Sequence, residues 1–118
     1  MKTILIVDDH PRFRAQVRAL LESDGFSVIG EAGDGAAGLR AASDLRPDLV
    51  LLDIGLPDIE GFEVAHELAR AAAPPHVVLT SSREATAFGG RIEATPALGF
   101  IAKEDLSGES IRALMDAA

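Results

Sequence analysis

Residues 48–53 read Asp-Leu-Val-Leu-Leu-Asp, a short run that is apolar except for the acid at each end. A continuous apolar run of this length is typical of a strand whose two faces are both buried in a sheet. We expect the strand to span Asp48–Leu52, which leaves Asp53 just past its carboxyl end. The stretch therefore predicts a buried strand that presents an acid at the edge of the sheet.

Similar runs recur along the chain, and segments with the apolar spacing of helices separate them. The other expected strands are Thr3–Val7, Ser27–Glu31, His76–Thr80 and Gly99–Ala102. The five expected helices carry apolar stripes at Phe13, Val17, Leu20 and Leu21; at Leu39 and Ala42; at Val64 and Leu68; at Ala85, Phe88 and Ile92; and at Ile111, Leu114, Met115 and Ala118. Ser107 is a candidate N-cap of the last helix. Gly89-Gly90 interrupts the fourth helix, at a cost of about 1 kcal/mol per glycine.

This alternation predicts one α/β domain that spans residues 1–118. Short buried strands that alternate with helices form a parallel sheet with helices on both faces. The doubly wound arrangement with strand order 2-1-3-4-5 makes the first and third strands neighbours, and the strand order reverses between them.

The composition indicates a soluble protein of the cytoplasm. The chain has no cysteine, and no apolar run approaches the roughly 20 residues that a membrane span needs. Its amino terminus lacks the long apolar stretch of a secretory signal. The net charge is −8, from 11 basic and 19 acidic residues. Because phosphate backbones bind basic patches, we expect no direct contact between this chain and nucleic acid, and none with membranes.

Polar residues stand where the predicted strands end. Asp8-Asp9 follow the first strand, Asp53 the third, and Lys103 the last, while Thr80-Ser81 close the fourth. Ligands of open parallel sheets bind outside the carboxyl ends of the strands, where the strand order reverses. We therefore expect these side chains to meet in one crevice.

The chemistry of that crevice favours phosphoryl transfer. Three carboxylates repel one another, and one divalent cation together with the Lys103 ammonium offsets the charges of Asp8, Asp9 and Asp53. Oxygen ligands favour Mg²⁺, with Mn²⁺ as an alternative. A carboxylate beside such a cation can attack a phosphoryl group, and Lys103 and the Thr80 hydroxyl can neutralise and position its oxygens. The acyl phosphate product is reactive, which favours a timed signal over a stable modification.

In combination these residues resemble the motif set of response-regulator receiver domains of two-component signal transduction. The motifs are Asp8-Asp9, Asp53-Ile-Gly-Leu-Pro57 with Gly61, Thr80-Ser81 and Gly99-Phe100-Ile-Ala-Lys103, and they cover essentially the whole chain. The resemblance implies a flavodoxin-like, three-layer α/β/α fold. It also implies phosphoryl transfer from a sensor histidine kinase or a phosphotransfer protein. Such a protein catalyses its own phosphorylation and dephosphorylation and is not a conventional enzyme.

The resemblance implies a role for each matching residue. Asp53 would be the phosphoacceptor and a metal ligand, Asp9 a direct metal ligand, and Asp8 a ligand through water. The backbone carbonyl of Gly55 would be a further ligand. Apart from the resemblance, His10 is itself a candidate metal ligand, although a place at the surface or beside the site without contact to the metal is favoured.

The same resemblance implies a switch. Thr80 would bond a phosphoryl oxygen, Lys103 would pair with the phosphate, and Phe100 would be the aromatic residue that moves inward with Thr80. Ser82, two positions after Thr80, is a candidate for tuning the rate of hydrolysis. One departure from the family is Glu104, where many members have a proline after the lysine, often with a cis peptide bond.

Two short motifs are similar to those of receivers attached to helix-turn-helix transcription regulators. They are His10-Pro11, and Lys103-Glu-Asp-Leu106. The resemblance leaves open whether the receiver works alone or lacks such an output domain, and phosphorylation in this class can favour homodimers.

One motif indicates a different function. Gly33-Asp-Gly35-Ala-Ala-Gly38 fits the G-x-G-x-x-G fingerprint of dinucleotide binding. Glu31 near the end of the preceding strand and the shortness of the chain, which leaves no room for a substrate domain, argue against it. The stretch also resembles the ordinary turn that follows the second strand of receivers.

Two further functions remain as alternatives. One is an interaction module that keeps the receiver shape without being phosphorylated, which predicts no response to Mg²⁺. The other is a metal-dependent phosphatase, although no second acid follows Asp53 in the D-x-D arrangement that such enzymes tend to use.

Overall fold

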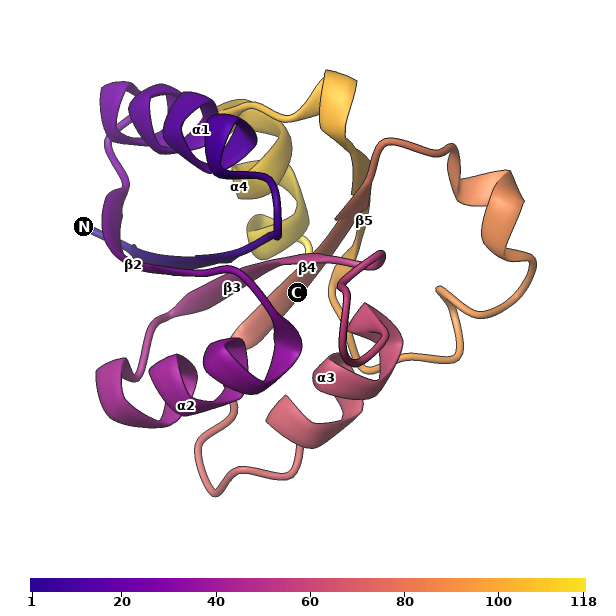
Figure 1. Ribbon diagram of the computed structural model, residues 1–118. Coiled ribbons are helices and arrows are strands. Elements are labelled where there is room, and N and C mark those ends of the chain that lie inside the picture. Colours follow the sequence, from indigo (N-terminus) through magenta and orange to yellow (C-terminus); the bar gives the residue numbers. More distant parts are fainter.

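A five-stranded parallel sheet forms the centre of the computed structural model, which describes residues 1–118 (Figure 1). The strands are β1 (Thr3–Val7), β2 (Ser27–Ala32), β3 (Leu49–Asp53), β4 (His76–Ser81) and β5 (Gly99–Ala102). Their order is β2-β1-β3-β4-β5, and every neighbouring pair is parallel. The predicted doubly wound fold and its strand order are confirmed. The predicted strand bounds agree with the observed ones to within a residue.

Helices cover both faces of the sheet and complete the three-layer α/β/α architecture (Figure 1). The helices are α1 (Pro11–Ser23), α2 (Gly35–Leu45), α3 (Gly61–Leu68) and α4 (Gly108–Asp116). α1 and α4 lie on one face, and α2 and α3 lie on the other. None of these helices has the length and apolar character that crossing a membrane requires.

The central strands divide their side chains between two hydrophobic cores. In β1, Ile4 and Ile6 pack with residues of α1 and α4, whereas Leu5 and Val7 pack with residues of α2 and α3. Successive side chains of a strand point to opposite faces, so a strand without polar interior positions is buried on both. This burial fixes the place where β1 and β3 end, and the polar residues that follow these strands are held there.

The helix ends confirm some sequence expectations and correct others. Ser107 caps α4, and its hydroxyl accepts a hydrogen bond from the Ser110 amide while the Ser110 hydroxyl accepts one from the Ser107 amide. The apolar stripes of α1 and α4 were each predicted too wide at one position. Leu20 is 39% exposed at the margin of the α1 stripe, and Ala118 lies beyond the end of α4 at Asp116.

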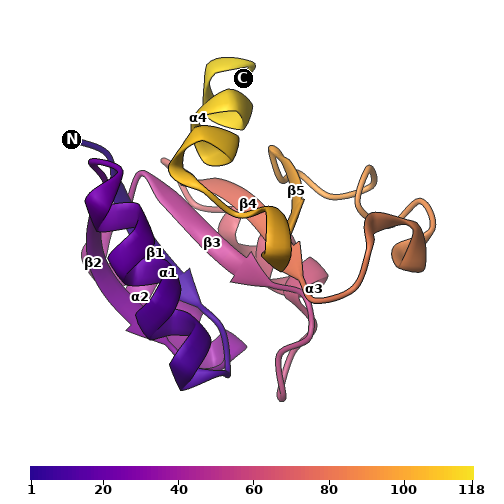
Figure 2. The ribbon, with the colours of Figure 1, turned by 90° about the horizontal axis from the view of Figure 1, so that it is seen from above.

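The predicted fourth of the five helices is wrong. Residues that were expected to form it make only a 3₁₀ turn, Ala85–Phe88, which ends at Gly89 with φ 59°. Glycine adopts this backbone conformation without strain and weakens a continuing helix, so Gly89-Gly90 ends the helical pattern. Figure 2 shows the segment between β4 and β5 as an irregular loop that extends away from the sheet.

Candidate functional site

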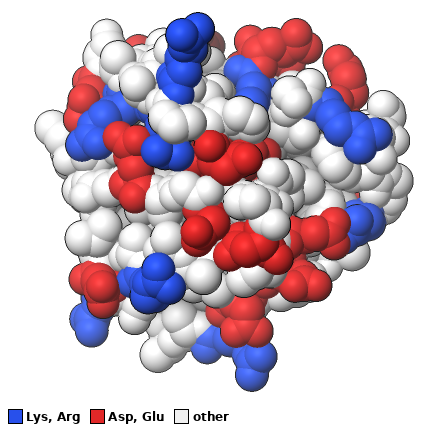
Figure 3. All heavy atoms as spheres, viewed as in Figure 1, with Lys and Arg blue, Asp and Glu red and all other residues white.

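The predicted site residues lie together at the carboxyl ends of the strands. Asp8 follows β1, Asp53 ends β3, and Thr80 is paired in register with Asp53 across β3 and β4. Lys103 begins a 3₁₀ turn directly after β5. Acidic side chains gather in the middle of the face shown in Figure 3, near the ends of β1 and β3.

Lys103 bridges two of the acids. Its Nζ lies 2.7 Å from Asp8 Oδ2 and 3.5 Å from Asp53 Oδ2. The Asp8 and Asp53 side chains are only 1% and 5% exposed, so the ammonium offsets charges that water cannot solvate. The ammonium also lies over the ring of Phe13, 4.3 Å from its centroid, in a cation–π contact.

Burial raises the pKa of Asp53 above its ordinary value, and the charge of Asp8 raises it further. Lys103 and the Gly55 amide act in the opposite direction, and the amide donates a hydrogen bond to Asp53 Oδ1 at 3.2 Å. A carboxylate that is held ionised against this cost has a strong tendency to bind a cation or a proton.

The acidic group has the composition of a site for a hard cation. One ligand atom from each of Asp8, Asp9, His10 and Asp53 lies within 4.8 Å of every other. Asp8 Oδ2 is paired with the Lys103 ammonium at 2.7 Å, whereas the buried Asp9 Oδ1 faces the His10 ring at 3.1 Å and accepts no hydrogen bond. Buried oxygens without donors are costly unless a further cation or water satisfies them. The cluster can therefore hold a metal ion among its carboxylates.

His10 and Arg14 fix the turn that carries the acidic pair. The His10 amide donates to Asp8 Oδ1 at 2.9 Å, and His10 Nδ1 lies 3.1 Å from an oxygen of both Asp8 and Asp9. Arg14 Nη1 donates to the Asp8 carbonyl at 2.6 Å, while its Nε pairs with Glu31. The sequence pattern did not single out Phe13 or Arg14 for the site. Their only signal was their place in the first turn of the helix that follows the acids.

The switch candidates lie on the side of the site away from β1. The buried Thr80 hydroxyl donates to the Ile101 carbonyl at 2.7 Å. Phe100 is half-buried on the α2 and α3 side of the sheet. Its ring centroid lies 6.0 Å from that of Phe88 in the irregular loop. Every peptide bond is trans, including the one between Lys103 and Glu104.

The glycine-rich turn has a partner within the chain. Gly38 packs on Val7, which suits close contact between α2 and the sheet. The amides of Gly35 and Ala36, which would face a pyrophosphate in a dinucleotide site, donate instead to the carboxylate of Asp58 at 2.8 and 3.0 Å. Asp58 was not predicted, because it lies far from these amides in the sequence.

Comparison with known proteins identifies the relatives of this chain. Residues 4–115 match the family model of the response regulator receiver domain. The chain is 40% identical over 110 residues to the virulence-factor transcription regulator BvgA of Bordetella pertussis, covering 93% of this chain and 53% of that protein. It is 35% identical over 119 residues to the transcriptional regulatory protein YdfI of Bacillus subtilis, covering 100% of this chain and 55% of that protein. The chain thus spans about half the length of these curated relatives.

Solved structures agree with the fold and the family. The signal receiver domain of the response regulator NarL from Mycobacterium tuberculosis superposes with a TM-score of 0.84 at 35% identity, covering 98% of this chain and 94% of that one. A two-component response regulator of the LuxR family from Aurantimonas has a TM-score of 0.87 at 26% identity, covering 99% of this chain and 84% of that one. This chain belongs to the response regulator receiver domain family.

Proposed function

We propose that residues 1–118 form one receiver domain that takes a phosphoryl group onto Asp53 in a Mg²⁺-dependent reaction. The donor would be a phosphohistidine of a sensor histidine kinase or of a phosphotransfer protein. The observation that carries the proposal is the acidic cluster, in which ligand atoms of Asp8, Asp9 and Asp53 lie within 4.8 Å of one another beside the Lys103 ammonium.

The proposed reaction is an in-line displacement at phosphorus. A carboxylate oxygen of Asp53 forms a bond to phosphorus, the phosphorus–nitrogen bond of the phosphohistidine breaks, and the neutral imidazole leaves after taking up a proton. Asp9, Asp53 and the Gly55 carbonyl would hold Mg²⁺, with Asp8 assisting through water, and the ion would supply positive charge for the phosphoryl oxygens; Mn²⁺ would be able to replace it. Lys103 moves its ion pair from Asp53 to a phosphoryl oxygen.

Dephosphorylation would occur in the same site. A water molecule attacks phosphorus, inorganic phosphate leaves, and the Asp53 carboxylate is regenerated. The chain in this proposal promotes reactions of its own side chain and turns over no free substrate, so it is not a conventional enzyme. Ser82 is exposed beside Ser81, which suits a role in admitting that water.

Phosphorylation would be read through Thr80 and Phe100. The Thr80 hydroxyl gives up its hydrogen bond to the Ile101 carbonyl and donates to a phosphoryl oxygen instead. The space it leaves permits Phe100 to turn inward from its half-buried position. The change would alter the surface around β5 that a partner, an output domain or a second copy of the domain in a homodimer contacts.

The proposed partner on the output side is a helix-turn-helix domain outside this chain, as the relationship to transcription regulators suggests. The net charge of −8 favours DNA contact by such a domain and not by the receiver itself. A cytoplasmic location follows from this proposal, because kinase, receiver and DNA must share a compartment.

The test is phosphorylation by a small donor. With acetyl phosphate and Mg²⁺, intact-protein mass spectrometry should show one added phosphate on the wild type and none on Asp53→Asn. An exposed control, Asp105→Asn, should be labelled like the wild type. Labelling of the Asp53→Asn variant would refute the assignment of Asp53, and an unlabelled wild type that is also unaffected by Mg²⁺ would favour the interaction module.

A further inference from the structure

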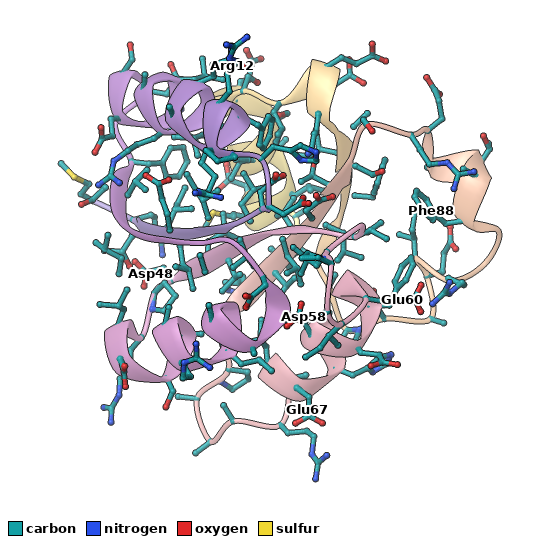
Figure 4. The ribbon with its side chains drawn as sticks, in the orientation of Figure 1. Arg12, Asp48, Asp58, Glu60, Glu67 and Phe88 are labelled. Atoms are coloured by element: carbon teal, nitrogen blue, oxygen red, sulfur yellow. The ribbon has the colours of Figure 1, made fainter.

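The loop after Asp53 is closed on itself and fastened to α2. The Gly61 amide donates to the Ile54 carbonyl at 2.9 Å, which closes the loop of residues 55–60 at its base. From the tip of this loop the Asp58 carboxylate accepts hydrogen bonds from the amides of Gly35 and Ala36 at the start of α2. Figure 4 shows Asp58 in the space between α2 and α3.

The start of α2 is built to receive this carboxylate. The first amides of a helix have no partner within it, and the helix dipole favours a negative charge there. The two amides hold the pKa of Asp58 below its ordinary value. A Cβ at Gly35 would lie 3.1 Å from Ile59 Cβ and 3.2 Å from Asp58 Oδ1, so a side chain there would push the loop away. The glycine-rich turn thus serves an anion that the chain itself supplies.

The loop makes one other contact through a charged side chain, an ion pair, and this contact is weaker. On the opposite side, Glu60 (labelled in Figure 4) pairs with Arg91 of the irregular segment at 2.9 Å. Both side chains are more than half exposed, at 55% and 53%, and exposed pairs of this kind contribute little. Leu56 and Ile59 of the loop are half-buried against the α2 and α3 side of the core, and Asp58 provides the main polar fixed point of the loop apart from its base.

Gly55 lies between the end of β3 and this fixed point. Its amide donates to Asp53 Oδ1 at 3.2 Å, and, its chain neighbours apart, no atom lies within 4 Å of where a Cβ would be, so no packing on that face holds it. Its position depends on what the loop is fastened to. We propose that Asp58 is a positioning residue for the site of Asp53 and its metal, an inference that rests on the function proposed above. It fastens the loop to α2 and so holds Gly55 where its amide orients the Asp53 carboxylate and its carbonyl faces the cation.

The physical consequence is a higher affinity for the cation, because the loop is preorganised. A loop that is already fixed loses little conformational freedom when a cation binds, whereas a released loop must be ordered at that moment. Supporting residues of metal sites commonly change metal affinity by ten- to hundredfold when they are removed. For a hydrogen-bonded loop at the surface, we expect a loss at the lower end of that range.

The experiment compares two carboxylates at the same helix end. Asp58→Ala removes the tie to the loop, whereas Asp34→Ala removes the local cap, whose carboxylate accepts from the Ala37 amide at 2.7 Å. Free Mn²⁺ is measured by electron paramagnetic resonance during titration of each protein, because the chain has no tryptophan or tyrosine to report binding by fluorescence. Asp58→Ala should weaken Mn²⁺ binding roughly tenfold, and Asp34→Ala should change it less than about twofold, although both lower the melting temperature. Asp58→Asn, which keeps one acceptor oxygen, should recover part of the loss.

A second readout needs no variant. Coupling between two sites is reciprocal. If the hydrogen bonds between Asp58 and the start of α2 increase the affinity for the cation, binding of the cation must stabilise those hydrogen bonds by the same factor. Amide hydrogen exchange at Gly35 and Ala36 in the wild type should slow on addition of Mg²⁺ by about the factor that Asp58→Ala loses in affinity. The Ala37 amide, which bonds to Asp34, should change less.

The outcomes separate this inference from the function on which it rests. Equal Mn²⁺ affinities of Asp58→Ala and the wild type, equal losses in the two alanine variants, or exchange at Gly35 and Ala36 that ignores Mg²⁺ would overturn the role of Asp58 alone. A wild type that binds no Mn²⁺ would overturn the proposed metal site and this inference together.

Discussion

Asp53 lies in an environment that has opposing effects on its charge. Desolvation and the neighbouring Asp8 favour the protonated carboxyl, while Lys103 and the Gly55 amide favour the carboxylate, and the net result is a raised pKa. The same oxygens are those that a cation or a phosphoryl group would contact. An unfavourable charge in the resting protein thus becomes the driving force for what the site is proposed to bind.

The raised pKa of Asp53 makes the stability of the metal-free protein depend on pH. Because the folded pKa lies above the unfolded one, the contribution of this group is fully present below the unfolded pKa and is lost as the pH rises through the folded pKa. At neutral pH, in a chelating buffer, Asp53→Asn should therefore melt at a higher temperature than the wild type. The difference should shrink as the pH falls through the range in which the carboxyl becomes protonated.

Thermal unfolding followed by far-ultraviolet circular dichroism measures this difference. Asp105→Asn serves as the control, because Asp105 is exposed and its substitution should leave the pH profile of the wild type unchanged. A variant at Asp53 that melts at or below the temperature of the wild type at neutral pH would show that the carboxylate does not destabilise the fold.

Residues that share a structural position could be found from the sequence, and residues joined only by side-chain contacts could not. Asp8, Asp53 and Lys103 were predicted together because each follows an expected strand, and parallel strands end at one edge. Asp58 and Arg14 contact backbone groups of other elements, at Gly35 and at Asp8. Such contacts have no sequence period, and only the packed structure reveals them.

At the scale of an element, the segment between β4 and β5 shows that apolar spacing alone does not predict secondary structure. Of the three residues in its predicted stripe, Phe88 and Ile92 pack against the α2 and α3 side of the core, whereas Ala85 is exposed. Apolar spacing alone does not make a helix, because every residue must also adopt the helical backbone. Gly89 instead has φ 59°, so the segment turns there. Phe88 still contacts Phe62 and Phe100, with ring centroids 5.8 and 6.0 Å away.

Replacing both glycines tests whether they set the shape of this segment. Gly89→Ala combined with Gly90→Ala should favour a longer helix after Glu84, by about 1 kcal/mol for each glycine removed. An alanine at φ 59° and ψ −132° would also strain the present turn by roughly 1–3 kcal/mol, which acts in the same direction. Backbone chemical shifts of residues 84–95 report the change directly.

Thr86→Ala is the matched control for that experiment. It raises helix propensity within the same turn but leaves both glycines in place, so it should shift the helical population much less. If the double variant keeps the chemical shifts of the wild type, packing of the segment on Phe62 and Phe100 determines its conformation, and the glycines do not.

At the scale of the whole molecule, the acidic site is placed where its charge can influence the entire fold. Asp8 and Asp53 extend from β1 and β3, two central strands that contribute side chains to both hydrophobic cores. Lys103 reaches them from the turn after β5, so one ion-pair cluster links the middle of the sheet to its edge. A ligand that relieves the repulsion in this cluster therefore stabilises the domain as a unit.

Mg²⁺ should consequently raise the stability of the domain. At free Mg²⁺ one hundred times its dissociation constant, the free energy of unfolding increases by about 2.7 kcal/mol, which corresponds to roughly 10 °C in melting temperature for a domain of this size. The increase should be much smaller for Asp53→Asn, which removes a charged ligand. It should also be smaller at pH 5 than at pH 8, because protons compete for the Asp53 carboxylate, whose pKa is raised.

Calorimetric scans with Mg²⁺ and with an equal ionic strength of NaCl separate specific binding from screening of the net charge of −8. An equal shift in wild type and Asp53→Asn would locate the bound cation away from Asp53.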